Sequence, residues 1–208
     1  LYFSCKQSGE QTFKVVNLKC EHLINPIGLD AQGPRFSWQM ASTSNGIAQE
    51  AYQMVVGTDP HFRTESLIWD SGKLASDVNL VEYSGPSLMP FTKYFWGVQA
   101  WDNHGEYAVS EVATFETGMM QMANWRGSWI SDSRDIHIKP APYFRKEFSV
   151  SKKVKFARVY TAVAGLYELS INGKLVGNHR LDPMYTRFDR RTLYVTHDVT
   201  EFIKEGPN

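Results

Sequence analysis

Apolar and polar side chains alternate along several short segments between residues 12 and 118, which predicts β-strands, because strand side chains alternate with a period of two. The expected buried faces are Phe36 and Trp38 in one segment, Tyr52, Met54 and Val56 in the next, and Tyr94, Trp96, Val98 and Ala100 in a third. A fourth segment, residues 112–117, alternates in the same way before Gly118. Short strands at this spacing predict a β-sandwich over residues 12–118.

The same alternation returns in residues 140–208, in segments 143–148, 156–160 and 167–171. Within the last of these, Tyr167, Leu169 and Ile171 share an apolar face. Asn172-Gly173 follows directly and fits a two-residue hairpin, whose turn needs positive φ at both central positions. We therefore predict an all-β chain of two consecutive sandwiches, with residues 119–139 as the linker.

The linker carries Trp125 and Trp129, which allow two interpretations. Their rings could form a platform for stacking sugars. They could equally pack into a cleft between neighbouring domains, which is the commoner use of two large aromatic side chains so close together.

Asp132, Asp135 and His137 are the candidate metal ligands of the linker. Carboxylates and an imidazole can coordinate a divalent ion, but calcium loops have more oxygen ligands and a positioned glycine. The sequence therefore favours solvated linker charges, and we expect neither a metal nor any other cofactor. The other histidines, His22, His61, His104, His179 and His197, show no spacing that indicates a site.

Charge adds little to this description. The 22 basic residues balance the 22 acidic ones and are spread along the chain, so nucleic acid is not an expected partner. The basic run at Lys152–Lys155 is interpreted as a solvated turn. No segment approaches the roughly 20 apolar residues of a membrane-spanning helix.

Two cysteines, Cys5 and Cys20, are too few for a disulfide scaffold and lack the spacing of a zinc site. Residues 1–11 are similar to the end of a bacterial lipoprotein signal followed by a polar tether, which would make Cys5 the lipid attachment site. This predicts a periplasmic or cell-surface protein anchored to the outer membrane. The alternative is that Leu1-Tyr2-Phe3 derives from an expression vector and that Cys5 is an unmodified thiol.

Three short motifs give the first sandwich a family resemblance: Arg35-Phe36-Ser37-Trp38, Ala51-Tyr52-Gln53 and Trp69-Asp70-Ser71-Gly72-Lys73. In outline the region resembles a fibronectin type III or immunoglobulin-like domain. More narrowly, it resembles the leading domain of bacterial α-L-rhamnosidases of glycoside hydrolase family 78.

The second sandwich resembles a galactose-binding-like jelly roll, and is most similar to the N-terminal domain of the same rhamnosidases. The resemblance rests on the Asn172-Gly173 hairpin, Leu181-Asp182-Pro183 and Asp198-Val199-Thr200, in that order. In the family an apolar strand usually follows the segment that ends here at Asn208. The resemblance therefore implies a truncated jelly roll that is less stable alone than with the rest of the protein.

The resemblance covers only the non-catalytic front of the family. It implies an inverting enzyme that removes terminal α-L-rhamnose from glycans, with the catalytic (α/α)6 barrel absent from this chain. The expected partners are that downstream barrel and a rhamnose-containing glycan. Glu168, Asp182, Asp189 and Asp198 do not match the catalytic motifs, so no catalytic residue is expected and the 208 residues alone should be inactive. Two alternatives stay open: a carbohydrate-binding module, and a structural surface lipoprotein without glycosidase activity.

Overall fold

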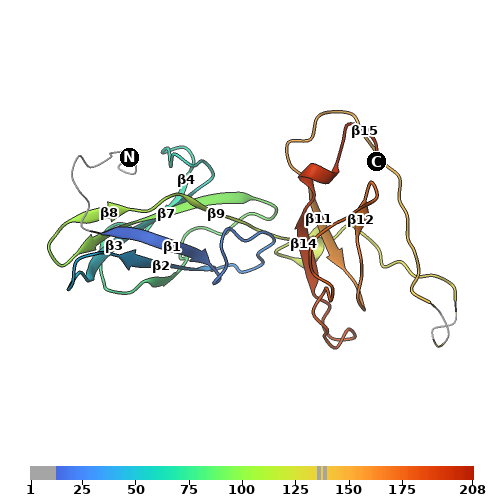
Figure 1. Ribbon diagram of the computed structural model, residues 1–208, viewed down its shortest axis with the longest axis horizontal. Coiled ribbons are helices and arrows are strands. Elements are labelled where there is room, and N and C mark those ends of the chain that lie inside the picture. Colours follow the sequence, from blue (N-terminus) through green and yellow to red (C-terminus); the bar gives the residue numbers. More distant parts are fainter. Residues whose placement is uncertain (1–12, 135–136, 138–139) are drawn as a thin grey trace. The chain divides into compact units, whose positions relative to one another are not determined.

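The chain forms two compact units, residues 1–125 and 126–208, which we call the first and second units (Figure 1). The structure is a computed structural model and describes residues 13–134, 137 and 140–208. Apart from two 3₁₀ turns, η1 (Met122–Asn124) and η2 (Thr200–Phe202), the regular structure in these residues is β. The predicted all-β class is confirmed.

Two antiparallel sheets build the first unit (Figure 1). One sheet has the order β1-β2-β6, with β1 (Lys14–Cys20), β2 (Arg35–Ala41) and β6 (Leu80–Glu82). The other has the order β4-β3-β7-β8, with β4 (Leu67–Asp70), β3 (Gln49–Gly57), β7 (Lys93–Asp102) and β8 (Tyr107–Val109). Two short strands complete it, β5 (Leu74–Ala75) on β3 and β9 (Ala113–Glu116) on β7.

Aromatic side chains from both sheets meet between them. Phe36 on β2 lies against Trp96 on β7, with ring centroids 4.6 Å apart, and Trp38 lies 5.2 Å from Tyr52 on β3. Phe36, Trp38 and Trp96 are at most 1% exposed. The faces predicted from the period of two are the buried faces of β2, β3 and β7, and the predicted β-sandwich is confirmed.

In the second unit the described strands form three separate antiparallel pairs. These are β10 (Ser149–Val150) with β15 (Gly206–Pro207), β11 (Arg158–Ala162) with β14 (Tyr194–Asp198), and β12 (Ser170–Ile171) with β13 (Lys174–Leu175). The hairpin between β12 and β13 has the predicted turn, because Asn172 has φ 51° and Gly173 has φ 76° while Ile171 pairs with Lys174.

The strand predicted over residues 143–148 does not form. Tyr143 is fully exposed and Phe144 is 55% exposed, and regular pairing begins only at Ser149. Alternation shows that a segment can be a strand, but a strand also needs a neighbour to satisfy its backbone groups. The described residues supply that neighbour only for the last residue of the segment, Phe148, whose N–H and C=O bond to Asn208 just before the β10–β15 pair begins.

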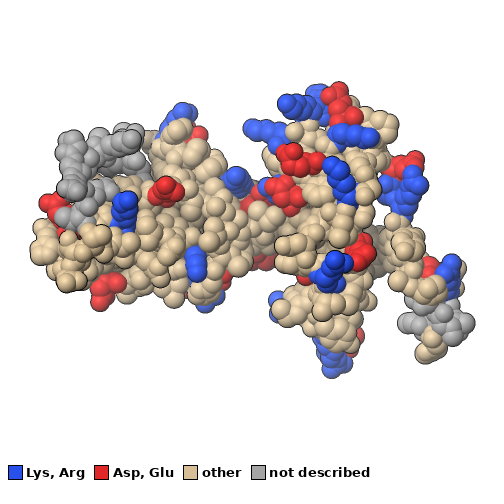
Figure 2. All heavy atoms as spheres, in the orientation of Figure 1, with Lys and Arg blue, Asp and Glu red and all other residues tan. Residues whose placement is uncertain are grey.

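The two units differ in how completely they bury apolar side chains. Of the 22 buried hydrophobic residues among those that the structure describes, only Val176 and Val199 belong to the second unit. Its surface carries interspersed positive and negative side chains on the face that Figure 2 shows. The second unit thus has short strands and few buried apolar side chains. The two cavities described below both lie in this unit and are lined largely by polar residues.

Candidate functional site

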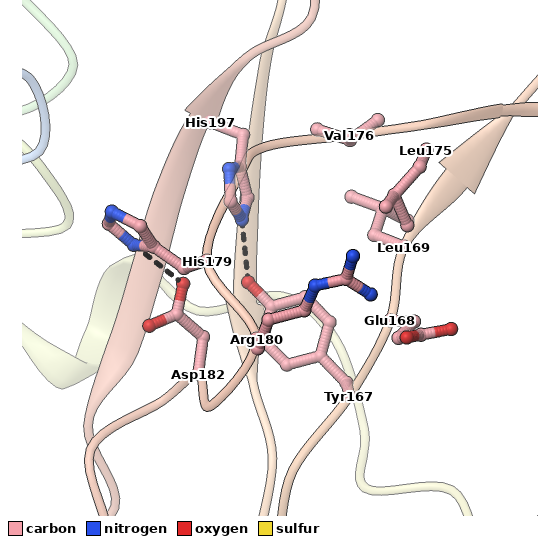
Figure 3. Close-up of a pocket in the computed structure, with 9 residues that line it drawn as sticks. All are labelled: Tyr167, Glu168, Leu169, Leu175, Val176, His179, Arg180, Asp182 and His197. Carbon is pink, nitrogen blue, oxygen red and sulfur yellow. Dashed lines mark hydrogen bonds and ion pairs between the residues drawn. The ribbon is translucent and has the colours of Figure 1, made fainter.

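A small cavity in the second unit is lined by several titratable side chains that contact one another (Figure 3). It lies between the segment that leads into β12, the segment that follows β13, and β14. The lining residues are Tyr167, Glu168, Leu169, Leu175, Val176, His179, Arg180, Asp182 and His197. The cavity volume is about 10 Å³, which is room for roughly one water molecule.

Tyr167 and His197 form the central contact of this cavity (Figure 3). The Tyr167 Oη atom lies 2.6 Å from His197 Nε2, and the two rings meet edge to face. His197 is placed by β14, where it pairs with Val159 of β11. Tyr167 is placed by its backbone N–H, which donates to the Asp182 carbonyl at 3.2 Å. The contact therefore joins the loop before β12 to the β11–β14 pair.

A second polar pair lies beside the first. His179 Nδ1 is 3.1 Å from Asp182 Oδ2, with the His179 side chain largely exposed and the Asp182 side chain mostly buried. Figure 3 shows this pair next to the Tyr167–His197 contact, whereas Glu168 lies on the other side of Tyr167.

Burial governs the protonation of the central pair. Desolvation lowers the pKa of His197, and the nearby Asp182 carboxylate opposes this shift only in part. Desolvation also raises the pKa of Tyr167, against a hydrogen bond with Thr161 that lowers it. Both shifts favour the neutral forms, so near neutral pH the contact joins a phenol and an uncharged imidazole.

Gly177 lets the chain pass close to the His197 ring. A Cβ atom at this position would lie 3.0 Å from His197 Cε1 and 3.2 Å from Nδ1, and φ of Gly177 is 78°. Both the short distance and the left-handed backbone favour glycine. The residue thus fixes the path of the segment between β13 and His179.

Three of the acidic residues considered in the sequence each lie beside a histidine or arginine side chain. Asp182 pairs with His179, Asp189 lies 2.7 Å from Arg187, and Asp198 lies 2.9 Å from Arg158 on the paired strand. Glu168 is exposed at the cavity. In inverting glycosidases the two carboxyl groups face each other across roughly 6.5–9.5 Å in a substrate pocket. The cavity has room for water rather than for a sugar. We call its four hydrogen-bonded residues, Tyr167, His179, Asp182 and His197, the polar joint.

The remaining predicted residues fall into two groups. Cys5 and Asp135 lie outside the described residues. Asp132 and His137 lie within them, and no cluster of three His, Cys, Asp or Glu side chains in the described part of the chain could hold a metal ion. Cys20 is a buried free thiol, and burial raises its pKa. Among the described residues no helix has the length and hydropathy of a membrane span.

A larger groove, of about 630 Å³, lies elsewhere in the second unit. Its lining consists of residues 144–149, Ser170, Asn172, Gly173, Pro207 and Asn208. Trp129, Tyr143 and Tyr185 are exposed aromatic side chains, but none of them lines this groove or the smaller cavity. The aromatic side chains at these two places are Phe144 and Phe148, which are 55% and 43% exposed in the larger groove, and Tyr167, which is half-buried at the smaller cavity. An exposed Trp or Tyr, which would favour a sugar-binding module, lines neither of them.

Sequence reasoning assigned no role to His179 or His197, and so missed the polar joint. Tyr167 and His197 are 30 positions apart. The pairing of β14 with β11 places His197, and the hydrogen bond from the Tyr167 N–H to the Asp182 carbonyl places Tyr167. The one local signal was Leu181-Asp182-Pro183, which places the carboxylate just before a proline whose peptide bond is cis.

Two family profiles match the chain, one for each unit. Residues 15–121 match the Rha78A-like, N-terminal immunoglobulin domain, and residues 152–208 match the α-L-rhamnosidase N-terminal domain. The two matches have the order that the sequence motifs predicted.

Individual relatives agree with the profiles. The chain is 42% identical to an α-L-rhamnosidase of Streptomyces avermitilis over 94% of its length and 32% identical to one of Formosa agariphila over 99%. Among solved structures, an α-L-rhamnosidase from Dictyoglumus thermophilum superposes over 94% of the chain with a TM-score of 0.86 and 38% identity, and the chain covers 24% of that structure. The chain spans only 21% and 25% of the Streptomyces and Formosa relatives, respectively.

Proposed function

Because this chain belongs to the α-L-rhamnosidase family, as an N-terminal region of it, we propose that the whole protein hydrolyses terminal α-L-rhamnose from glycans. In this proposal the two units support a catalytic domain that lies further along the same polypeptide. The observation that carries it is the match of both units, in order, to the two N-terminal domains of rhamnosidases.

The catalytic step belongs, in this proposal, to an (α/α)6 barrel outside these residues. An inverting mechanism needs one carboxylic acid to protonate the leaving oxygen and a carboxylate to activate water on the opposite face of the sugar. Asp182, Asp189 and Asp198 each lie beside a histidine or arginine side chain, which supports the placement of that carboxyl pair elsewhere.

The proposal is tested by release of nitrophenol from nitrophenyl α-L-rhamnoside. The 208-residue chain and the product of the complete gene are assayed side by side, with nitrophenyl β-D-glucoside as the control substrate. We expect rhamnoside hydrolysis by the longer protein alone. Activity in neither protein would contradict the proposal and favour a structural surface protein or another glycosidase.

The inverting mechanism is tested separately, by the anomer of rhamnose that is released first. Proton NMR of the sugar released during the first minutes distinguishes the two anomers before they equilibrate. An inverting enzyme releases the β-anomer from an α-rhamnoside. Initial release of the α-anomer would overturn the inverting mechanism and leave the rhamnosidase activity intact.

We also propose that Cys5 is the lipid attachment site and that the protein is held at the outer membrane, facing the periplasm or the cell surface. The support is the run of apolar and small residues before Cys5 and the polar residues after it. Labelled palmitate should enter the product of the complete gene, and Cys5→Ser should abolish labelling. Cys20→Ser is the control and should keep the label, because Cys20 is a buried thiol in β1.

A further inference from the structure

Asparagine is followed directly by glycine at two places in the sequence, Asn45-Gly46 and Asn172-Gly173. Asparagine is a chemically labile residue, and a following glycine, which has no Cβ, leaves its backbone nitrogen open to attack the asparagine side chain. The first pair lies in the connection between β2 and β3 (Figure 1), and the second forms the turn between β12 and β13. Both pairs have the same reactive groups, so the fold decides how each one reacts.

The reactive groups of the first pair are accessible. Asn45 and Gly46 are both exposed. Among the described residues, the Asn45 side chain and the Gly46 N–H make no hydrogen bond. Gly46 has φ 77°, and no atom lies within 4 Å of the position that its Cβ would take. The Gly46 nitrogen and the Asn45 side chain are therefore free to approach each other.

The loop around the first pair is fixed on one side only, by Asn103 directly after β7. Asn103 Nδ2 donates to the Gly46 carbonyl at 3.0 Å, and Asn103 Oδ1 accepts from the Ala48 N–H at 3.1 Å. The Asn103 N–H also donates to the Ala48 carbonyl at 3.0 Å. The peptide bond between Asn45 and Gly46 lies just before this anchored part of the loop.

The side chain of Asn172 is held by its amide nitrogen. Asn172 Nδ2 donates to the Phe202 carbonyl and to Asn208 Oδ1, each at 2.9 Å. Attack by the Gly173 nitrogen requires the side chain to turn and then to lose this same Nδ2 atom. Both hydrogen bonds must break first, so reaction at Asn172 depends on local opening of the turn.

We propose that Asn45 is a site of spontaneous deamidation in the folded protein and that Asn172 is protected from the same reaction. The Gly46 nitrogen attacks Asn45 Cγ, and the new N–Cγ bond closes a succinimide ring. The Cγ–Nδ2 bond breaks, and Nδ2 leaves as ammonia with the proton that the Gly46 nitrogen gives up. The proposal does not depend on the rhamnosidase activity.

Water completes the reaction by opening the succinimide at one of its two carbonyl carbons. Cleavage of the N–Cγ bond gives aspartate at position 45. Cleavage of the bond between the ring nitrogen and the main-chain carbonyl carbon gives isoaspartate, in which the backbone runs through Cβ and Cγ. Both products carry a new negative charge, but only isoaspartate lengthens the connection between β2 and β3, by one carbon atom.

Mass spectrometry of tryptic peptides tests the proposal in the product of the complete gene. Peptides 36–63 and 159–174 contain Asn45 and Asn172, respectively, as their single asparagine. After incubation of the folded protein at mildly alkaline pH, we expect Asn45 to react at least ~10-fold faster than Asn172, because two hydrogen bonds hold the Asn172 amide. Reaction of Asn45 no faster than that of Asn172 would overturn the proposal.

The same protein unfolded in guanidinium chloride is the control. We expect the two rates to become similar there, since neither side chain is then held. An unchanged ratio of rates would assign the difference to the flanking residues and would overturn the protection by the fold.

Asn208→Ala tests the protection at Asn172 directly. The substitution removes one of the two acceptors of Asn172 Nδ2. We expect faster deamidation of Asn172 in this variant and an unchanged rate at Asn45, which lies in the first unit. An unchanged rate at Asn172 would contradict protection through these hydrogen bonds.

Hydrogen exchange of the aged protein separates the two products. Peptides with aspartate or isoaspartate at position 45 are resolved by chromatography, and Asn45→Asp provides the aspartate form alone. We expect faster exchange at Ala48 only in the isoaspartate form, because the longer backbone disturbs the contacts of Asn103 with Gly46 and Ala48. Equally fast exchange in Asn45→Asp would assign the effect to the new charge and would contradict the role of backbone length.

Discussion

Gly177 is a residue at which backbone conformation and side-chain contact can be separated by experiment. Gly177 and Gly173 have nearly equal φ, 78° and 76°, but only Gly177 has a neighbour, the His197 ring, within 4 Å of its missing Cβ. Gly173→Ala therefore reports left-handed strain alone, which costs about 1–2 kcal/mol. We expect Gly177→Ala to destabilise the second unit by more than this, because the His197 ring must also move.

The measurement is urea unfolding followed by the methyl signals of Val199, which is buried in the second unit. Equal losses of unfolding free energy in the two variants would show that the His197 ring moves aside without destabilising the unit. Glycine would then be required at position 177 only for its left-handed backbone conformation.

The burial of His197 predicts that the stability of the second unit depends on pH. Burial lowers its pKa in the folded state from the ordinary value of 6.5, so between the two values the unfolded chain binds more protons than the folded chain. The free energy of unfolding of the second unit should therefore fall as the pH drops below about 6.5. His197→Gln should flatten this dependence, whereas His61→Gln in the first unit should leave it unchanged. An unaltered slope in His197→Gln would assign the dependence to other groups.

At the scale of elements, the β12–β13 hairpin connects to the end of the chain through one side chain. Asn172→Asp keeps a residue that tolerates positive φ but replaces the amide that donates to Phe202 and Asn208 with an acceptor. We expect the second unit to lose about 1–3 kcal/mol of stability and β15 to exchange faster. Asn178→Asp is the matched control in an exposed loop, and should leave both quantities nearly unchanged. An equal effect at both positions would point to added charge rather than to lost hydrogen bonds.

Elements also show where sequence reasoning succeeds and where it ends. The buried faces of β2, β3 and β7 were predicted because each strand is long, has neighbours and faces one core, so that alternation maps directly onto burial. The Asn172-Gly173 turn was predicted because its chemistry is local. Residues 143–148 alternate as clearly, yet they form no strand, because pairing depends on a neighbour whose position the local pattern does not contain. The polar joint was missed for the same reason, since the contact of Tyr167 with His197 depends on two long-range features: the pairing of β11 with β14, and the hydrogen bond from the Tyr167 N–H to the Asp182 carbonyl.

On the scale of the whole molecule, the two units differ in how completely they bury apolar side chains. We therefore expect the stability of each unit to change differently when the polypeptide is longer. The first unit buries its aromatic residues between two complete sheets, whereas the second has short strand pairs and leaves Phe144, Phe156 and Leu166 exposed. Apolar area removed from water stabilises a fold by roughly 25 cal/mol per Å². A polypeptide that covers these side chains should therefore stabilise the second unit and leave the first unit nearly unchanged.

The prediction is checked by hydrogen exchange along a urea series, read separately at β7 and at β14, in the 208-residue chain and in the product of the complete gene. We expect the same urea midpoint for β7 in both proteins and a higher midpoint for β14 in the longer one. Equal midpoints for β14 would contradict the dependence of the second unit on the polypeptide beyond Asn208. A rise of both midpoints by the same amount would mean that the longer protein stabilises the two units together, and the sparse core of the second unit would then not be the cause.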